Sequence, residues 1–258
     1  MTAYNIYDEI DALKAKDKAK DELFNNVLAR LAALEKPVVA ARYPYDLTQA
    51  KITYAFKGTD GKAFEEPSSE ALKNPKKGLT INADGSLTFD NEGDATTKNS
   101  DGFRVEWRWF KSLADKTNYK WNETLIVPAY GVVFDILSTT TGVYAGQIHG
   151  TTTAALLKID FGKNDIRAII SRDEAGKDMV TPSFGVKPVI GKEYAISFSR
   201  KEKLLEVFLY EADRKNKKLG KLLGTIVEKN VYRTDEMYAK AGVYSNARAK
   251  ATHFIVNL

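Results

Sequence analysis

Three short segments, far apart along the chain, place reactive polar side chains at every second residue. They are Arg104–Arg108 (RVEWR), Gln147–His149 (QIH) and Tyr238–Tyr244 (YAKAGVY). Residues two apart in a β-strand project from the same face of a sheet. In extended form the segments would therefore gather cations, a carboxylate, an amide, an imidazole and phenols on one face: Arg104, Glu106, Arg108, Gln147, His149, Tyr238, Lys240 and Tyr244. Such a face suits an anionic ligand and holds the groups that proton transfer requires.

The alternate positions of the same segments are apolar. They are Phe103, Val105, Trp107, Trp109, Ile148, Met237, Ala239, Ala241 and Val243. An antiparallel sheet commonly packs one face on the core and leaves the other to solvent or ligand. The sequence therefore predicts that strands of one sheet position the polar groups.

Each segment also has a simpler interpretation when it is taken alone. The charges of Arg104, Glu106 and Arg108 could form a solvent-facing ladder of weak ion pairs. His149 could be structural, and Tyr238 and Tyr244 could simply fill a β surface. A functional site is favoured because all three segments depart from the usual pattern in the same way and supply complementary chemistry.

The composition is that of an ordinary folded domain. Of 258 residues, 43% are hydrophobic and 28% are charged, which is enough apolar material for a large core. No apolar run reaches the length that spans a bilayer, so we expect no membrane partner. Cysteine is absent, which excludes disulfides, zinc–thiolate sites and cysteine nucleophiles.

The net charge is modestly positive. Lys and Arg number 39 against 34 Asp and Glu, and this excess favours an anionic partner. No basic helix, zinc-finger spacing or RNA-binding aromatic motif is present, so nucleic acid is not expected.

The N-terminal residues show the spacing of a helix. Over residues 4–35 a register with steps of four and three runs through apolar Ile6, Ile10, Leu13, Phe24, Val27, Leu31 and Leu34, with a polar break at Asp17 and Lys20, and Pro37 would end the helix. The pattern predicts a helix over residues 1–36 that serves as an oligomerisation stalk, making the protein a homo-oligomer. A helix packed on its own domain would give a similar stripe.

From residue 37 to residue 258 the pattern is that of a β domain. Short runs rich in Val, Ile, Phe, Tyr and Thr alternate with turn signals, which predicts a jelly-roll β-sandwich with a concave groove. The expected strands outside the three segments cover residues 51–57, 79–82, 86–90, 131–137, 154–161, 166–171, 194–200, 204–210 and 251–258. Two longer loops, at residues 58–77 and 172–191, are expected to cover the groove.

The three segments together resemble those of the alginate lyases of polysaccharide lyase family 7. Those enzymes carry R-x-E-x-R, Q-[IV]-H and Y-x-K-x-G-x-Y segments in this order on a β-jelly roll. Here they correspond to Arg104–Arg108, Gln147–His149 and Tyr238–Tyr244. The resemblance covers about residues 50–258 and leaves out the N-terminal helix.

The resemblance implies β-elimination on a polymer of uronic acids. A base removes the proton at C5, next to the carboxylate, and the 4-linked sugar leaves. By resemblance, Arg104, Gln147 and Arg108 neutralise the carboxylate and so stabilise the enolate-like transition state. His149 is the base for one C5 epimer, since an ordinary imidazole titrates near pH 6.5. Tyr244 protonates the leaving oxygen and serves as both base and acid for the other epimer.

The remaining matched residues are implied in binding and positioning. A phenol that acts as a base needs a nearby cation, and Arg104, Arg108 and Lys240 are the candidates. Glu106 would hold the arginines in place. Tyr238, Lys240 and Asn246 would bind sugar or carboxylate at neighbouring subsites. The scheme requires no metal and no cofactor.

The identity of the polymer stays open at this stage. Ile148 is associated within the family with guluronate-containing substrates, which favours alginate. Val105, Trp107, Trp109 and Ala239 differ from common family residues and are expected to alter the floor and edge of the groove. Glucuronan or a bacterial capsule rich in uronic acid is therefore an alternative.

Two other classes of function compete with a lyase. A glycoside hydrolase needs two carboxylates about the scissile bond, and Glu106 has no carboxylate partner on its own strand. A non-catalytic carbohydrate-binding sandwich would not require an acid–base pair such as His149 and Tyr244.

An enzyme that degrades polysaccharide would act outside the cell. The N-terminus is charged and shows no secretory signal. We therefore expect export by another route, association with a virion, or a signal missing from this sequence.

Overall fold

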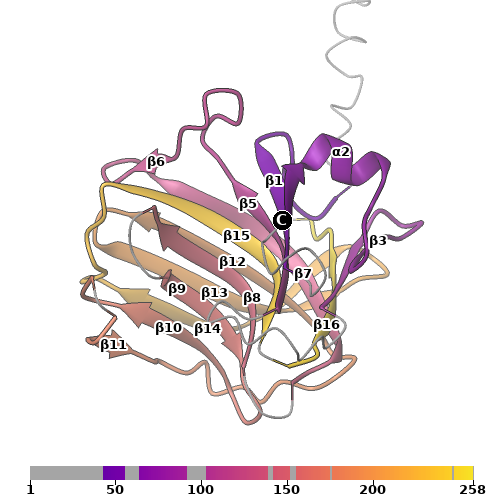
Figure 1. Ribbon diagram of the computed structural model, residues 1–258. Coiled ribbons are helices and arrows are strands. Elements are labelled where there is room, and N and C mark those ends of the chain that lie inside the picture. Colours follow the sequence, from indigo (N-terminus) through magenta and orange to yellow (C-terminus); the bar gives the residue numbers. More distant parts are fainter. Residues whose placement is uncertain are drawn as a thin grey trace, which may run out of the picture. The chain divides into compact units, whose positions relative to one another are not determined.

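The computed structural model describes residues 43–55, 64–91, 103–138, 142–151, 155–174, 176–245 and 247–257. Within these ranges the chain forms two antiparallel sheets whose apolar faces pack on a shared core (Figure 1). The predicted N-terminal helix, and with it the predicted boundary at residue 36, lies outside the described residues. No helix in the described ranges is long and apolar enough to cross a membrane.

The first sheet, sheet A, carries the three polar segments. Its hydrogen-bonded order is β11-β10-β9-β8-β15-β5-β1-β2, and β6 pairs with β15. The strands are β1 (Ala50–Ala55), β2 (Phe64–Pro67), β5 (Phe103–Trp109), β6 (Tyr119–Lys120), β8 (Val143–Gly150), β9 (Ala155–Phe161), β10 (Ile166–Ser171), β11 (Met179–Val180) and β15 (Glu236–Ser245).

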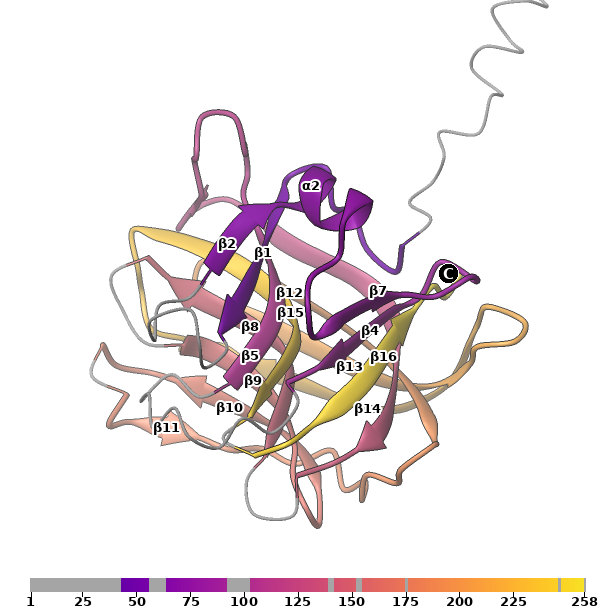
Figure 2. The same ribbon diagram turned by 45° about the vertical axis from the view of Figure 1, so that its right-hand side comes forward.

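The second sheet, sheet B, packs against the first (Figure 2). Its order is β14-β13-β12-β7-β16-β4-β3. The strands are β3 (Leu79–Ile81), β4 (Leu87–Asp90), β7 (Leu125–Ile136), β12 (Glu193–Lys201), β13 (Leu204–Asp213), β14 (Lys218–Glu228) and β16 (Lys250–Phe254). Neighbours along the sheets are often distant in sequence, as in a Greek-key or jelly-roll sandwich, so the predicted fold class is confirmed.

The core lies between the two sheets because the strands alternate inward apolar and outward polar residues. Large side chains from both sheets are fully buried there, including Trp107 and Phe161 from sheet A and Tyr130, Phe134 and Phe198 from sheet B. Burying one such side chain stabilises the fold by about 2–3 kcal/mol. This rigid core fixes the position of the outward face of sheet A.

The first expected loop, at residues 58–77, is in part regular structure, so that prediction is wrong. Strand β2 and the short helix α2 (Ser68–Lys73) lie within it. Pro67 precedes the helix in an extended conformation, and the buried hydroxyl of Ser68 donates to the backbone oxygen of Leu47. The segment is mostly polar and buries only Ser68 and Ala71 of the helix, so its composition is that of a loop.

The second expected loop, at residues 172–191, runs along the edge of sheet A. Only β11 is regular within it. Beyond β11 its backbone continues to bond with β10, from Ile166 N to Val186 O (2.7 Å) and from Ala168 N to Pro182 O (3.0 Å). The segment therefore covers an edge that would otherwise leave strand hydrogen bonds open.

Candidate active site

The three polar segments lie on adjacent strands, in the order β8-β15-β5 (Figure 1). Tyr238 of β15 faces His149 of β8 in register, and Lys240 faces both Gln147 of β8 and Arg108 of β5. Antiparallel pairs bring directly opposed side chains to about 5 Å on one face. Segments about 40 and 90 residues apart in sequence thus form one continuous surface.

The alternate positions face the core as expected. Val105, Trp107, Ile148, Met237 and Val243 are all fully buried. Ala239 and Ala241 are also buried, at 1% exposure each. The expectation that Val105, Trp107 and Ala239 would alter the groove is therefore wrong, because these side chains pack beneath the sheet rather than on its polar face.

The polar face is not a solvated charge ladder. The Lys240 ammonium donates to Glu106 Oε1 at 2.6 Å, and the two side chains are only 9% and 3% exposed. A buried ion pair of this kind fixes geometry, and removing one partner costs about 3–5 kcal/mol. The sequence did not predict this pair, and its assignments of Lys240 to sugar binding and of Glu106 to holding the arginines stay predictions.

His149 contacts Gln147 and Tyr238 on its own face. Its Nε2 lies 2.6 Å from Gln147 Oε1, and its ring stacks on Tyr238 with centroids 5.7 Å apart and planes 13° apart. The Arg108 guanidinium lies 3.7 Å from the centre of the Tyr238 ring. Imidazole, phenol and guanidinium therefore form a stacked row across β8, β15 and β5.

Arg108 is anchored from the side of the row. Its Nη2 donates to Asn118 Oδ1 at 3.4 Å, and Asn118 Nδ2 donates to Glu236 Oε2 at 3.3 Å. Its Nε is buried with no hydrogen-bond partner among the described residues. An arginine held in this way keeps hydrogen-bonding capacity for an anion.

Tyr244 lies in a second aromatic group on the same face. Its ring stacks on Tyr144 with centroids 5.2 Å apart and planes 24° apart. Simple alternation would turn Tyr144 away from Gln147, but a β-bulge between Tyr144 and Gly146 restores it to the polar face while Ala145 faces the core. The bulge is why sequence reasoning did not find Tyr144.

Gly242 lets β15 approach β5 closely between Lys240 and Tyr244. Its φ is 142°, a conformation that residues with a Cβ rarely adopt. A Cβ at this position would lie 2.3 Å from the backbone oxygen of Val105. The glycine of the third segment is therefore required by backbone geometry.

A family model described as alginate lyase matches residues 45–257 of the chain. The chain belongs to the alginate lyase family. The resemblance inferred from the three segments is thereby confirmed, and the protein is a polysaccharide lyase. A search of curated protein sequences returned no match.

Solved structures of alginate lyases share the fold. The family 7 alginate lyase A1-II′ in complex with a product (GGG) matches with a TM-score of 0.66 at 18% identity, covering 83% of this chain and 96% of that one. The alginate lyase from Klebsiella pneumoniae matches with a TM-score of 0.62 at 14% identity, covering 81% and 94%. The Pseudomonas aeruginosa alginate lyase matches with a TM-score of 0.59 at 17% identity, covering 81% and 96%.

For two residues expected in the lyase site, the structure does not describe the side chain. Arg104 lies on β5, and its backbone pairs in register with Tyr244, but its side chain is not among those described. Asn246 lies outside the described residues. Their roles remain predictions.

Lys158 of β9 lies on the same polar face, and the sequence reasoning did not include it. It pairs in register with Gln147, and its ammonium lies 4.9 Å from the centre of the Tyr144 ring and 5.9 Å from that of Tyr244. Lys158 and Asp160 alternate with apolar residues in the strand sequence ALLKIDF, which repeats the pattern of the other polar segments. That alternation was the available signal.

The ionisation of this outer group is perturbed. Burial lowers the pKa of Lys158, and Lys240 lowers it further while Asp160 opposes the change. Burial also raises the pKa of Asp160, although Arg167 Nε donates to its Oδ2 at 2.9 Å. The pKa of Tyr144 is raised by burial and by Asp160. Burial thus shifts the pKa values of the lysine, the carboxyl and the phenol in favour of their neutral forms.

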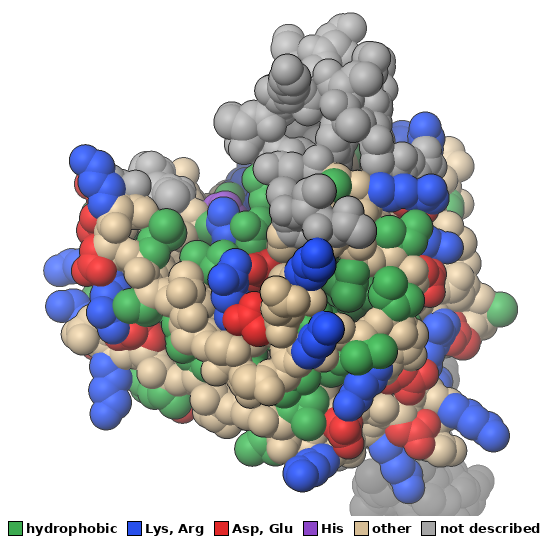
Figure 3. Space-filling model, turned by 90° about the horizontal axis from the view of Figure 1, so that it is seen from below, with side chains coloured by type: hydrophobic (Ala, Val, Ile, Leu, Met, Phe, Trp, Pro, Cys, Tyr) green, Lys and Arg blue, Asp and Glu red, His purple; other side chains and the backbone are tan. Residues whose placement is uncertain are grey.

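The surface around the lyase site mixes charge and apolar character. In the space-filling view, histidine surface lies beside lysine or arginine and hydrophobic side chains (Figure 3). Among the described residues, no group of three or more histidine, aspartate or glutamate side chains is placed to hold a metal ion.

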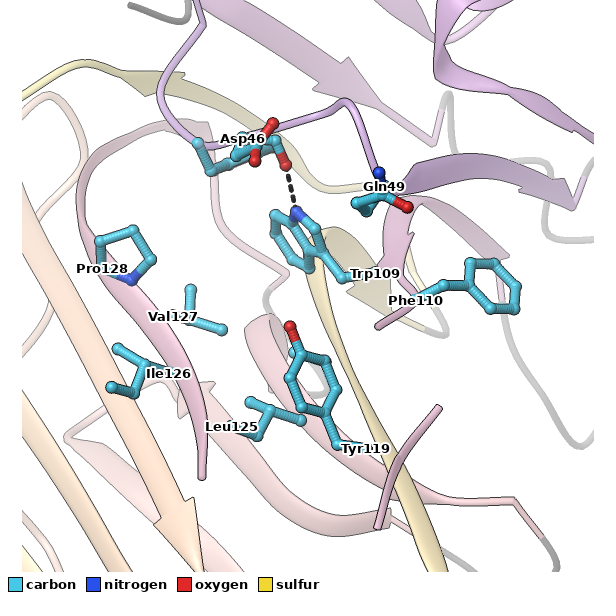
Figure 4. A pocket seen from close by; sticks show the side chains of 11 residues that line it. Asp46, Gln49, Trp109, Phe110, Tyr119, Leu125, Ile126, Val127 and Pro128 are labelled. Atoms are coloured by element: carbon cyan, nitrogen blue, oxygen red, sulfur yellow. Dashed lines mark hydrogen bonds between the residues drawn. The ribbon is translucent and has the colours of Figure 1, made fainter. Parts of the chain in front are cut away.

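A separate pocket of about 150 Å³ lies beside the end of β5 (Figure 4). Trp109, Phe110, Tyr119, Leu125 and Pro128 supply most of its apolar lining. The indole N–H of Trp109 donates to the backbone oxygen of Asp46, and both residues line the pocket. None of the polar residues of the three segments lines it, so we assign the site from the strand register instead.

Proposed function

We propose that this lyase cleaves alginate by β-elimination on the polar face of β8, β15 and β5. The observation that carries the proposal is that one surface holds an imidazole, a phenol and several cations. His149 and Tyr244 supply a base and an acid, and Arg108 and Gln147 supply donors. β-Elimination at a uronate needs these functions together.

The substrate carboxylate must be neutralised before the C5 proton can leave. Gln147 suits this role because its oxygen is engaged by His149 at 2.6 Å, which leaves its amide N–H groups for the substrate. Arg108 contributes positive charge from the neighbouring strand, with a buried Nε that has no partner among the described residues. In this scheme Arg104 completes the set. Donors fixed before the reaction stabilise the developing enolate without reorganisation.

The proton transfers are then divided between two groups. His149 accepts the C5 proton of one epimer. When Gln147 accepts a hydrogen from Nε2, the basic nitrogen is Nδ1. Tyr244 donates its proton to the leaving glycosidic oxygen. For the other epimer Tyr244 takes both roles, as the family resemblance implies.

The rival functions receive less support from the contacts. The buried carboxylate of Glu106 is paired with Lys240, and that of Asp160 is paired with Arg167. Neither is placed as an unpaired acid or nucleophile for hydrolysis. Alginate is favoured over other polyuronates because the unusual residues Trp107 and Ala239 face the core.

The decisive experiment measures the ultraviolet absorbance of the unsaturated uronate product. The purified protein is incubated in parallel with polymannuronate, polyguluronate, mixed alginate, glucuronan and hyaluronan. A rise with the alginate substrates is expected. A rise only with glucuronan or hyaluronan would refute alginate as the substrate, and a flat trace with clear polymer binding would favour a non-catalytic carbohydrate-binding protein.

We infer separately that residues 4–35 form an oligomerisation stalk, and that the enzyme acts outside the cell or on a virion. The heptad spacing supports the stalk. Light scattering of the full chain and of a variant lacking residues 1–36 tests it, since a monomer in both would contradict the inference.

A further inference from the structure

Lys158 has the surroundings of a functional cation rather than of a surface lysine. It is the half-buried residue in the middle of β9, whose other residues are all buried. Within the part of the chain that the structure describes, it makes no ion pair and no hydrogen bond through its ammonium. The closest carboxylate along its strand, Asp160, is bonded to Arg167.

A half-buried lysine without an ion-pair partner lowers the stability of the fold, so its presence suggests a functional role. Burial lowers the pKa of Lys158, which means that the surroundings disfavour its charged form. A methionine or leucine would pack against the same rings without that penalty. Functional sites often hold such groups at some expense of stability.

The groups that a positive charge at Lys158 can act on are two stacked phenols. The ammonium lies over the faces of Tyr144 and Tyr244, at 4.9 and 5.9 Å from the ring centres. The Tyr144 pKa is raised, so this phenol stays neutral at ordinary pH. Tyr244 is the phenol to which the proposed reaction assigns a proton transfer.

We propose that Lys158 is a positioning residue for Tyr244, holding a positive charge against the phenol ring so that its phenolate form is stabilised during proton transfer. The inference rests on the proposed function, because it gives Tyr244 the acid–base role. An opposite charge at about 4–6 Å favours the ionised form of its partner. This role was assigned above to Arg104, Arg108 or Lys240, but Lys240 is paired with Glu106 and Arg108 stacks on Tyr238.

Other charged groups also face this part of the sheet. These are Asp160 of the same strand β9, Arg167 of β10, Lys240 of β15 and Glu106 of β5. Asp160 with Arg167, and Lys240 with Glu106, are internally neutralised pairs. Arg104 pairs with Tyr244 in backbone register and remains when Lys158 is changed, so a single substitution isolates the lysine.

The test is a spectroscopic titration that does not depend on activity. Phenolate absorbance is followed with pH for the wild type and Tyr244→Phe, and for Lys158→Met and the double variant Lys158→Met/Tyr244→Phe. Subtracting the curve of the Tyr244→Phe variant from that of its parent, with and without Lys158, isolates the titration of Tyr244 from that of the other tyrosines among the 13. Loss of the lysine charge should move the Tyr244 midpoint up by about one pH unit. Lys158→Arg should keep it near the wild-type value.

Kinetics supply the second readout. The limb of the pH–rate profile that depends on Tyr244 should move to higher pH in Lys158→Met, with KM unchanged. Lys163→Met removes a positive charge of the same size from the exposed turn after β9. It should change neither the pH–rate profile nor KM. Thermal unfolding should show Lys158→Met folded and at least as stable as the wild type, because an unpaired, desolvated charge has been removed.

An unchanged Tyr244 midpoint in Lys158→Met would overturn the inference whatever the activity. A rise in KM with that midpoint unchanged would instead make Lys158 a carboxylate-binding residue. If no polymer is cleaved at all, the proposed function fails, while the titration still decides whether Lys158 acts on Tyr244.

Discussion

The two histidines of this lyase lie on opposite sheets and differ in burial. His149, on the polar face of sheet A, is half-buried, hydrogen-bonded to Gln147 and stacked on Tyr238. His253, on β16 of sheet B, is fully buried among aromatic rings, with Nδ1 3.2 Å from the Tyr45 hydroxyl. Burial lowers the pKa of His253 to about 3, so it stays neutral.

The contrast shows that environment, rather than residue type, decides what a polar group can do. On the face of sheet A, polar groups contact one another and keep capacity for a ligand. Between the sheets polar groups are buried, and burial favours their neutral forms. Four predictions test this difference.

The largest effect is expected from the proposed acid–base pair. Tyr244→Phe should lower product formation on every cleaved polymer by ~10²–10⁴-fold, the usual contribution of a general acid–base group, and His149→Phe should do so on polymer of the epimer for which His149 is the base. Polymer binding, measured by gel retardation or calorimetry, should remain. Tyr210→Phe on β13 of sheet B is the matched control for loss of a phenol hydroxyl and should keep wild-type turnover. Full turnover in both site variants would contradict the mechanism.

The next effect concerns the buried ion pair under the site. Glu106→Gln leaves the Lys240 ammonium buried without its carboxylate, and should lower the free energy of unfolding by about 3–5 kcal/mol. Urea unfolding measures the change. The exposed pair of Lys73 and Glu70, with side chains 73% and 58% exposed, is the control. Glu70→Gln should lower the free energy of unfolding by less than about 0.5 kcal/mol. Equal decreases for the two variants would contradict the contrast between the buried and the exposed ion pair.

Gly242→Ala should destabilise the site strand by about 3 kcal/mol. A positive φ is strained for alanine, and the added Cβ would meet the backbone oxygen of Val105. Gly185 also has a positive φ, 69°, but a Cβ there would meet nothing within 4 Å. Gly185→Ala therefore isolates the conformational cost and should lose only about 1 kcal/mol. A similar loss in both variants would show that the approach of β15 to β5 is unimportant.

The sequence predicted the polar face because strand alternation is strict in β5 and β15. Val105, Trp107 and Val243 had to face the core once those strands formed. Lys158 was missed for a different reason, because β9 directly follows β8 and pairs with it, but the polar alternation of Lys158 and Asp160 was not recognised as part of the same face. Tyr144 was missed because a bulge reverses the alternation locally. Strand β14 was missed because its leucines, lysines and glycines follow no regular alternation and most of its residues are exposed or half-buried.

The smallest effect, and the one that separates the two histidines, is the pH dependence of stability. The folded-state pKa of His253, about 3, lies below the ~6.5 of an unfolded chain, so between these values the unfolded state binds the additional proton. Its contribution to stability is therefore complete above pH ~6.5 and falls as the pH is lowered, by at most about 1.4 kcal/mol per pH unit. Carboxyl groups with lowered pKa, such as Asp84 and Glu228, act only at lower pH. Urea unfolding at pH 7, 6 and 5 should thus show a slope that His253→Phe removes and that His149→Phe leaves in place. If His149→Phe removed the slope instead, the histidine on the polar face would be the one whose charged form is disfavoured by folding. The division of the molecule into a reactive face and a neutral interior would then be wrong.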